Sequence, residues 1–188
     1  SREVLSTVGV AYHKEALRYA REPEFRHLLV VDAATRALGF RGVEHPVFKR
    51  FLDRAVQYYT QAVNADPAYA PALNNLAAAY LDLGDRDLAR GYVNRALRAD
   101  PTLASAYNNR ALAAIQAGDV RRAEEDFLTA ARLAPGLRDV VLNLSRLYEK
   151  QGRPEDARRW AARAQATPPA PEATPESLGG VTPGISQA

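Results

Sequence analysis

Asparagine is the residue type in this chain whose spacing suggests chemistry, because it recurs at matched positions of a 34-residue pattern. Asn75, Asn109 and Asn143 share one position of that pattern, and Asn74 and Asn108 precede two of them. The amide side chain carries a donor and an acceptor, so it can pair with both the N–H and the C=O of an extended peptide, whatever that peptide's side chains are. The same amides could instead bond to neighbouring backbone and only fix the packing of helices, and both interpretations stay open.

No set of residues in the sequence predicts catalysis. Cysteine is absent, and the chain has neither a phosphate-binding glycine loop nor a nucleophile elbow. His13, His27 and His45 lie far apart in sequence, and none has a partner three or four residues away that would complete a metal site on a helix. We therefore expect no enzyme activity, no metal and no cofactor.

Two charged stretches have simple structural interpretations. The acidic run from Glu124 to Asp126 stands beside Arg121 and Arg122 and predicts a solvated helix face with ion pairs three or four residues apart. The basic residues near Trp160 could meet an acidic partner, nucleic acid or an anionic lipid. We favour the polar face of a terminal capping helix, which an end repeat needs for solubility. These basic residues are Arg153, Arg158, Arg159 and Arg163.

Composition predicts a soluble globular or solenoid protein. The chain has 188 residues, 47% apolar and 25% charged, and no run approaches the roughly 20 apolar residues that cross a bilayer. The 25 basic residues outweigh the 22 acidic ones by only 3, spread along the chain, whereas nucleic-acid binders concentrate basic residues on one face. The absence of cysteine and a start at Ser1 fit the cytoplasm, or a periplasmic or exported location after removal of a leader.

The pattern that carries the asparagines runs from Ala70 to Pro101 and returns twice. Its apolar residues recur three or four apart, and two such stripes in each unit predict two facing helices. A glycine can take the positive φ that ends the first helix, a small alanine lets the helices approach, and a proline ends the second helix. The matching sets are Leu76, Ala77, Tyr80, Gly84, Ala89, Ala96 and Pro101, then Arg110, Ala111, Ala114, Gly118, Ala123, Ala130 and Pro135, then Leu144, Ser145, Tyr148, Gly152, Ala157, Ala164 and Pro169.

These residues resemble the tetratricopeptide repeat family from Ala70 to about Pro169, because the small, aromatic, glycine and proline positions keep one register through three units. Three positions depart from the pattern, with Arg110 for an apolar residue, Ala114 for tyrosine and Ala161 for a bulky residue. The resemblance implies an all-α fold. It is a right-handed superhelical solenoid of helix-turn-helix repeats in which the first helix of each unit lines a concave groove.

In that groove the asparagines are similar to the asparagine ladder in the repeat region of O-linked N-acetylglucosamine transferases, here without a catalytic domain. Family members that bind chaperone tails hold two carboxylates with basic residues where this chain has Asp139 and Asn143. We therefore do not expect an acidic C-terminal tail of that type to bind. The partner-binding residues implied by the resemblance are Asn74, Asn75, Asn108, Asn109, Asn143, Gln116 and Arg146.

The predicted organisation has four parts. Residues 1–46 form an N-terminal capping helical hairpin and loop, with helices from Arg2 to Arg21 and from Pro23 to near Gly39. Residues 47–69 form the closing helix of a partial repeat. Residues 70–169 hold three repeats (70–103, 104–137 and 138–169), with second helices slightly shorter than first ones. Residues 170–188 form an extended tail rich in proline and glycine, which should be disordered alone.

We therefore expect a non-enzymatic protein–protein interaction scaffold whose concave groove binds an extended peptide or a partner helix. The alternative is a permanent structural subunit of a larger multiprotein complex, docked by its tail and terminal helix. Both interpretations require a protein or peptide partner within a larger assembly, and neither requires nucleic acid.

Overall fold

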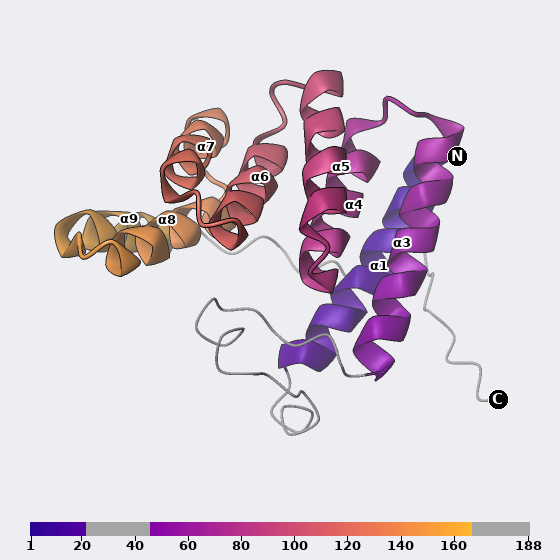
Figure 1. The fold of residues 1–188 in the computed structure, drawn as a ribbon, viewed down its shortest axis with the longest axis horizontal. Helices are drawn as coiled ribbons and strands as arrows, with labels where there is room; N and C mark the ends of the chain where they lie inside the picture. Colours follow the sequence, from indigo (N-terminus) through magenta and orange to yellow (C-terminus); the bar gives the residue numbers. More distant parts are fainter. Residues whose placement is uncertain (22–45, 167–188) are drawn as a thin grey trace.

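A computed structural model describes residues 1–21 and 46–166, and every regular element within these ranges is an α-helix (Figure 1). The second N-terminal helix and the tail that the sequence predicts lie outside the described residues. None of the described helices is long and apolar enough to cross a membrane. The helices are α1 (Arg2–Arg21), α3 (Pro46–Ala65), α4 (Ala70–Leu83), α5 (Arg86–Ala99), α6 (Ala104–Gln116), α7 (Val120–Leu133), α8 (Arg138–Lys150) and α9 (Pro154–Ala166).

A glycine turn joins the two helices of each full repeat. The backbone φ is 80° at Gly84, 81° at Gly118 and 70° at Gly152, the left-handed region that favours glycine. Asp85 and Asp119 follow two of these glycines, and each caps the next helix by accepting a backbone N–H from three residues further on. The predicted glycine turns are confirmed.

The second helices are not shorter than the first ones, so that prediction is wrong. Helices α5, α7 and α9 have 14, 14 and 13 residues, against 14, 13 and 13 for α4, α6 and α8. Helices α5 and α7 start directly after their capping aspartates, Asp85 and Asp119, so no residues are lost between the turn and the second helix.

The helices pack as four hairpins, α1 with α3, α4 with α5, α6 with α7 and α8 with α9. The alanines predicted to allow close approach are buried, with exposed fractions of 0% at Ala89 and Ala123 and 3% at Ala157. Burying a large apolar side chain contributes about 1.5–3 kcal/mol. The largest fully buried side chains are Tyr59, Phe127, Leu52, Leu73, Leu76, Leu144, Val93, Val140 and Val141.

The first hairpin follows the repeat register although its two helices are far apart in sequence. Gly9 of α1 lies against the ring of Tyr59 in α3, where an added Cβ would come within 2.5 Å of a ring carbon. Gly9 stands two 34-residue periods before Ala77, the small residue at the same position of the first full repeat. The predicted organisation assigned α1 and α3 to separate segments, and the structure pairs them. The rest of that division stays a prediction.

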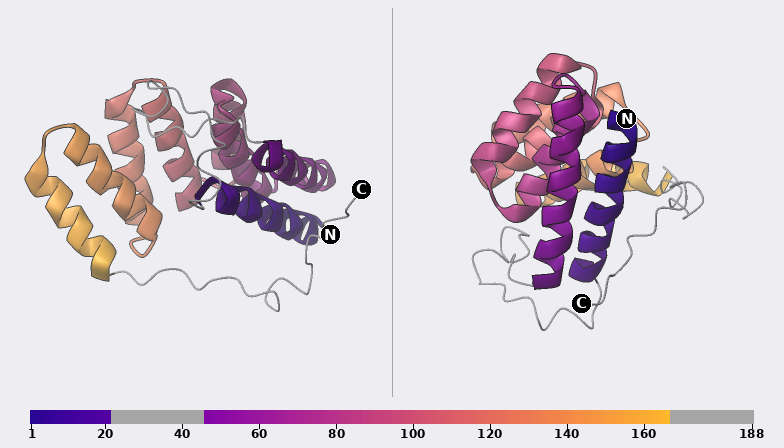
Figure 2. Two further views of the ribbon diagram at one scale, coloured as in Figure 1. Left: turned by 90° about the horizontal axis from the view of Figure 1, so that it is seen from below. Right: turned by 90° about the vertical axis from the view of Figure 1, so that its right-hand side faces the viewer.

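The stack of hairpins curves with its first helices inside, and forms a right-handed superhelical solenoid (Figure 2). Helix α1 contacts α4 and α4 contacts α6, whereas neighbouring second helices of the described chain make at most marginal contact. The side on which neighbouring units approach closely is the concave one. Helices α1, α4 and α6 therefore line an inner face, which α8 joins through the hydrogen bond from Asn143 to Asn108. Wedges open between the second helices on the outer face.

Candidate partner-binding site

The predicted asparagines lie on consecutive first helices and bond to one another across the repeats. Each unit carries two adjacent positions, such as Asn74 and Asn75. In each step, the side-chain amide at the second position donates to the side-chain oxygen at the first position of the preceding unit. We call this series the asparagine ladder. Its bonds run from Asn75 Nδ2 to Ser6 Oγ (3.3 Å), from Asn109 Nδ2 to Asn74 Oδ1 (2.8 Å) and from Asn143 Nδ2 to Asn108 Oδ1 (3.0 Å).

Ser6 is a ladder residue that the sequence interpretation missed. It is 6% exposed and extends the ladder onto α1. The signal in the sequence is its position two periods before Asn74, on the same helix as Gly9. The signal was easily overlooked because serine replaces asparagine there and because residues 22–45 separate α1 from α3.

Asn74 and Asn109 hold the first two full repeats together. Asn109 Nδ2 also lies 3.4 Å from the Asn74 backbone oxygen, which can only accept, so the orientation of this amide is fixed. Asn74 donates in turn to Ser105 Oγ at 3.2 Å. The two residues are only 6% and 9% exposed. For these two asparagines, the geometry supports the interpretation that they fix helix packing.

Asn75, Asn108 and Asn143 are half-buried, and they lie on α4, α6 and α8, whose register places them toward the inner face. The Oδ1 atoms of Asn75 and Asn143 accept no hydrogen bond from any described residue, and neither is shut off from solvent. Leu112 lies one turn after Asn108, and Leu142 takes the Asn108 position in the last repeat; both are half-buried. The inner face thus combines open amide acceptors with apolar surface.

The two remaining predicted residues do not join the ladder through hydrogen bonds. Gln116 ends α6, and its backbone oxygen accepts a hydrogen bond from Arg86 Nη1 at 2.9 Å. Its side-chain Oε1 is the buried polar side-chain atom that has no partner among the described residues. Arg146 is exposed on α8, one turn after Leu142, and so shares the inner face.

His13 has a structural place between three helices. Its Nε2 lies 2.8 Å from Asp82 Oδ2 on α4, and the Tyr59 hydroxyl on α3 lies 3.4 Å from its Nδ1. Burial, aided by the charge of Asp82, raises the pKa of Tyr59, which keeps the hydroxyl protonated. The described residues contain no group of three side chains placed to hold a metal ion. His27 and His45 lie outside them.

The acidic run on α7 is not a solvated face, so that prediction is wrong for Asp126. Asp126 is 5% exposed and accepts two bonds from Arg110 on α6, at 2.8 Å from Nε and 2.6 Å from Nη2. These bonds raise the pKa of Arg110, which stands where Leu76 and Leu144 stand in the other repeats. Spacing within one helix could not indicate a partner on another.

Glu124 joins the second full repeat to the third. It is half-buried, and burial alone would raise its pKa, but three donors outweigh that effect and hold the pKa below its usual value. Only Glu125 of the run stays on the solvated surface. The donors to Glu124 are the Tyr148 hydroxyl (3.0 Å), Gln151 Nε2 (3.2 Å) and Arg153 Nη1 (2.9 Å).

The basic helix α9 pairs most of its arginines locally. Arg158 pairs with Glu155 one turn earlier, Arg159 with Asp156, and the Arg163 guanidinium lies 4.4 Å from the centre of a Trp160 ring. This arrangement supports the interpretation of α9 as the polar face of a terminal helix.

Comparisons with known proteins agree with this geometry. Two family models, both described as tetratricopeptide repeat, match residues 52–113 and 108–171, which together are well over half of the chain. A search of curated proteins gave no significant match. Two crystal structures of MamA superpose with TM-scores of 0.53 and 0.54 at 20% and 21% identity, covering 64% and 75% of this chain and 67% and 77% of theirs.

A third solved structure is the first tetratricopeptide repeat domain of Spaghetti (RPAP3), bound to the HSP90 peptide SRMEEVD. It matches with a TM-score of 0.50 at 23% identity, over 55% of this chain and 82% of that one. At these identities the three likenesses show the fold.

Proposed function

Because the chain belongs to the tetratricopeptide repeat family, we propose that it is a protein-interaction module whose inner face binds an extended peptide through the asparagine ladder. Repeats of this family act in general without catalysis, by presenting a curved surface to a partner. The observation that carries the proposal is the pair of open acceptors, Asn75 Oδ1 and Asn143 Oδ1, near the two ends of the ladder.

The ladder itself prepares these acceptors for a partner. Each of the two amides donates through its nitrogen to the preceding unit, and its oxygen accepts no hydrogen bond from the described residues. A peptide backbone N–H can donate to such an oxygen without losing any bond that the fold uses. Because the amides are already ordered, binding does not have to immobilise them.

The spacing of the acceptors sets the length of the peptide. Packed helices lie about 8–10 Å apart, so Asn75 and Asn143, on first helices two units apart, are separated by roughly 20 Å. An extended peptide covers that distance in about six residues. The half-buried Leu112 and Leu142 lie on the same series of first helices and favour apolar side chains in the peptide.

An acidic tail of the SRMEEVD type is not the peptide that this inner face favours. The RPAP3 domain binds that peptide. In this chain the third repeat carries Asp139 and Asn143 at the positions where the resemblance places basic clamp residues, and Asp139 is exposed. A carboxylate there would repel an acidic tail.

The test is a selection of eight-residue peptides from a random library on the immobilised full chain, followed by affinity measurements. We expect the selected peptides to bind Asn75→Ala/Asn143→Ala roughly five- to 150-fold more weakly than the wild type, because each of the two lost bonds contributes about 0.5–1.5 kcal/mol. Asn64→Ala, an exposed asparagine on α3, is the matched control and should bind normally.

Equal affinity of the double variant and the wild type would overturn the ladder proposal. Isolation of the chain from its native source in a fixed-stoichiometry complex, with no peptide enriched in the selection, would favour the permanent structural subunit instead.

A further inference from the structure

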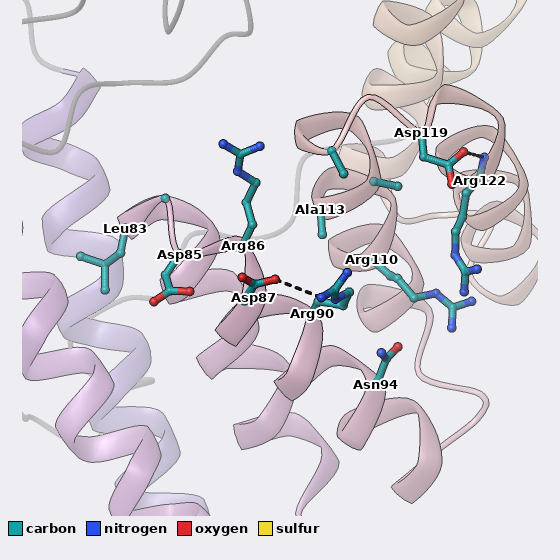
Figure 3. Close-up of a pocket in the computed structure, with 13 residues that line it drawn as sticks. Leu83, Asp85, Arg86, Asp87, Arg90, Asn94, Arg110, Ala113, Asp119 and Arg122 are labelled. Atoms are coloured by element: carbon teal, nitrogen blue, oxygen red, sulfur yellow. Dashed lines mark hydrogen bonds and ion pairs between the residues drawn. The ribbon is translucent and has the colours of Figure 1, made fainter.

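A hollow of about 960 Å³ opens on the outer face in the wedge between α5 and α7, with α6 at its base. Its lining includes four arginines: Arg86 and Arg90 from α5, Arg110 from α6 and Arg122 from α7 (Figure 3). We call it the arginine hollow. Its volume lies within the range of ligand pockets in proteins. None of its lining residues belongs to the asparagine ladder, so it is a separate surface.

The positive charge of the arginine hollow is only partly compensated. Arg110 is held by Asp126, and Arg90 pairs with Asp87 at 3.0 Å. Arg86 donates to a neutral backbone carbonyl. The Arg122 guanidinium forms no hydrogen bond or ion pair with any described residue. Two guanidinium groups thus lack a carboxylate partner.

The carboxylates at the rim form no ion pair with these two arginines, although they keep their charge and leave the lining with four arginines against three aspartates. Asp85 and Asp119 each accept the backbone N–H of the helix that they cap, at 3.0 and 3.1 Å. The caps also fill the N-terminal ends of α5 and α7, so an incoming anion would be held by side chains and not by a helix end.

The positions of the arginines are not explained by helix stability. Arg86 is the first residue of α5 and Arg122 the third residue of α7, at the positive ends of the two helix dipoles. The first turn of α7 contains no acidic residue. A cation there is locally unfavourable, and local rules are most often broken where a residue serves a partner.

We propose that the arginine hollow binds an acidic peptide segment of a partner protein, with two carboxylates of that segment meeting Arg86 and Arg122. Figure 3 shows Arg86 and Arg122 at different sides of the hollow, with Arg90 and Arg110 between them. A peptide can space its carboxylates to match and avoid the aspartates. A continuous row of phosphates in a nucleic acid would meet Asp85, Asp87 and Asp119 as well as the arginines.

The experiment uses a fluorescein-labelled octapeptide of alternating glutamate and alanine, with fluorescence anisotropy at low salt. We expect the wild-type full chain to bind this peptide, to ignore the peptide with glutamine in place of glutamate, and to lose affinity as salt is added. Arg86→Ala/Arg122→Ala, which removes the two arginines that meet the carboxylates, should weaken binding about tenfold, because charge-assisted bonds are the stronger kind.

The matched control is Arg98→Ala/Arg121→Ala, which removes the same charge from the same two helices outside the hollow. It should bind within about twofold of the wild type. Equal losses in the two double variants would overturn the proposal, since they would show attraction to overall charge. A labelled octathymidine that binds the hollow more tightly than the peptide would overturn it in favour of nucleic acid. Unchanged helical content by circular dichroism confirms that each variant is folded.

Discussion

The buried pair between Arg110 and Asp126 should destabilise the fold strongly when it is broken and little when it is replaced. Asp126→Ala leaves the Arg110 guanidinium without its two charge-assisted bonds in a partly dry site. The informative comparison is Arg110→Leu/Asp126→Tyr, which installs the residues found at the same two positions of the first full repeat, Leu76 and Tyr92.

The magnitudes follow from the burial of the two side chains. Breaking a fully buried pair by removing one partner costs about 3–5 kcal/mol. Arg110 keeps 23% of its side chain exposed, against 7% for Asp126, so solvent partly compensates the orphaned cation. We expect Asp126→Ala to lower the free energy of unfolding by about 2–3 kcal/mol. Replacing the two charged residues by leucine and tyrosine removes the desolvation penalty of the charges and should change stability by less than about 1 kcal/mol.

Urea denaturation followed by circular dichroism at 222 nm measures these differences. If Asp126→Ala changes the free energy of unfolding by less than about 0.5 kcal/mol, the pair does not hold α6 to α7. If the double replacement is as destabilising as the single one, uncharged side chains cannot take the place of the buried pair.

Three further predictions concern other contacts of the described chain. Gly9→Ala should destabilise the fold by about 1–3 kcal/mol, because the added Cβ meets the fully buried ring of Tyr59. Gly91→Ala has open space around the added Cβ and should stabilise the fold by about 0.5–1 kcal/mol. Thermal melts of the two variants compare these effects. Ala123→Glu places an unpaired charge at a site with 0% exposure and should abolish cooperative unfolding, seen as a broad or absent transition in urea. The pKa of Glu124 is lower in the folded state than its unfolded-state value near 4.5, so the ionised side chain stabilises the fold above pH 4.5, and this stability is lost as the pH falls through the folded-state pKa. Glu124→Gln has no such group and should lose less stability than the wild type between about pH 6 and about pH 3. Equal losses in the two proteins would contradict this prediction.

Much of the fold follows from local patterns in the sequence. Gly84, Gly118 and Gly152 mark the turns because few other residues take their φ, and the alanines between paired helices mark contacts that exclude larger side chains. Such signals act over a few residues. They therefore predict helices and turns well, and the fixed period extends them to the stack.

The parts that were wrong or missed depend on contacts between distant residues. Asp126 looks like a surface acid until Arg110 is placed beside it, and Ser6 looks unremarkable until α1 is paired with α3. For the asparagines, the sequence gives the positions but not the partners, because an amide is equally able to bond to a neighbouring amide or to a bound peptide.

The most direct test of peptide binding at the inner face is a ¹⁵N–¹H spectrum of the side-chain amide groups during titration with a selected peptide. If the inner face binds the peptide, the resonances of Asn75, Asn108 and Asn143 shift, while those of Asn64 on α3 and Asn94 in the arginine hollow stay in place. Shifts confined to Asn64 and Asn94, with the ladder amides unchanged at saturation, would contradict binding at the inner face.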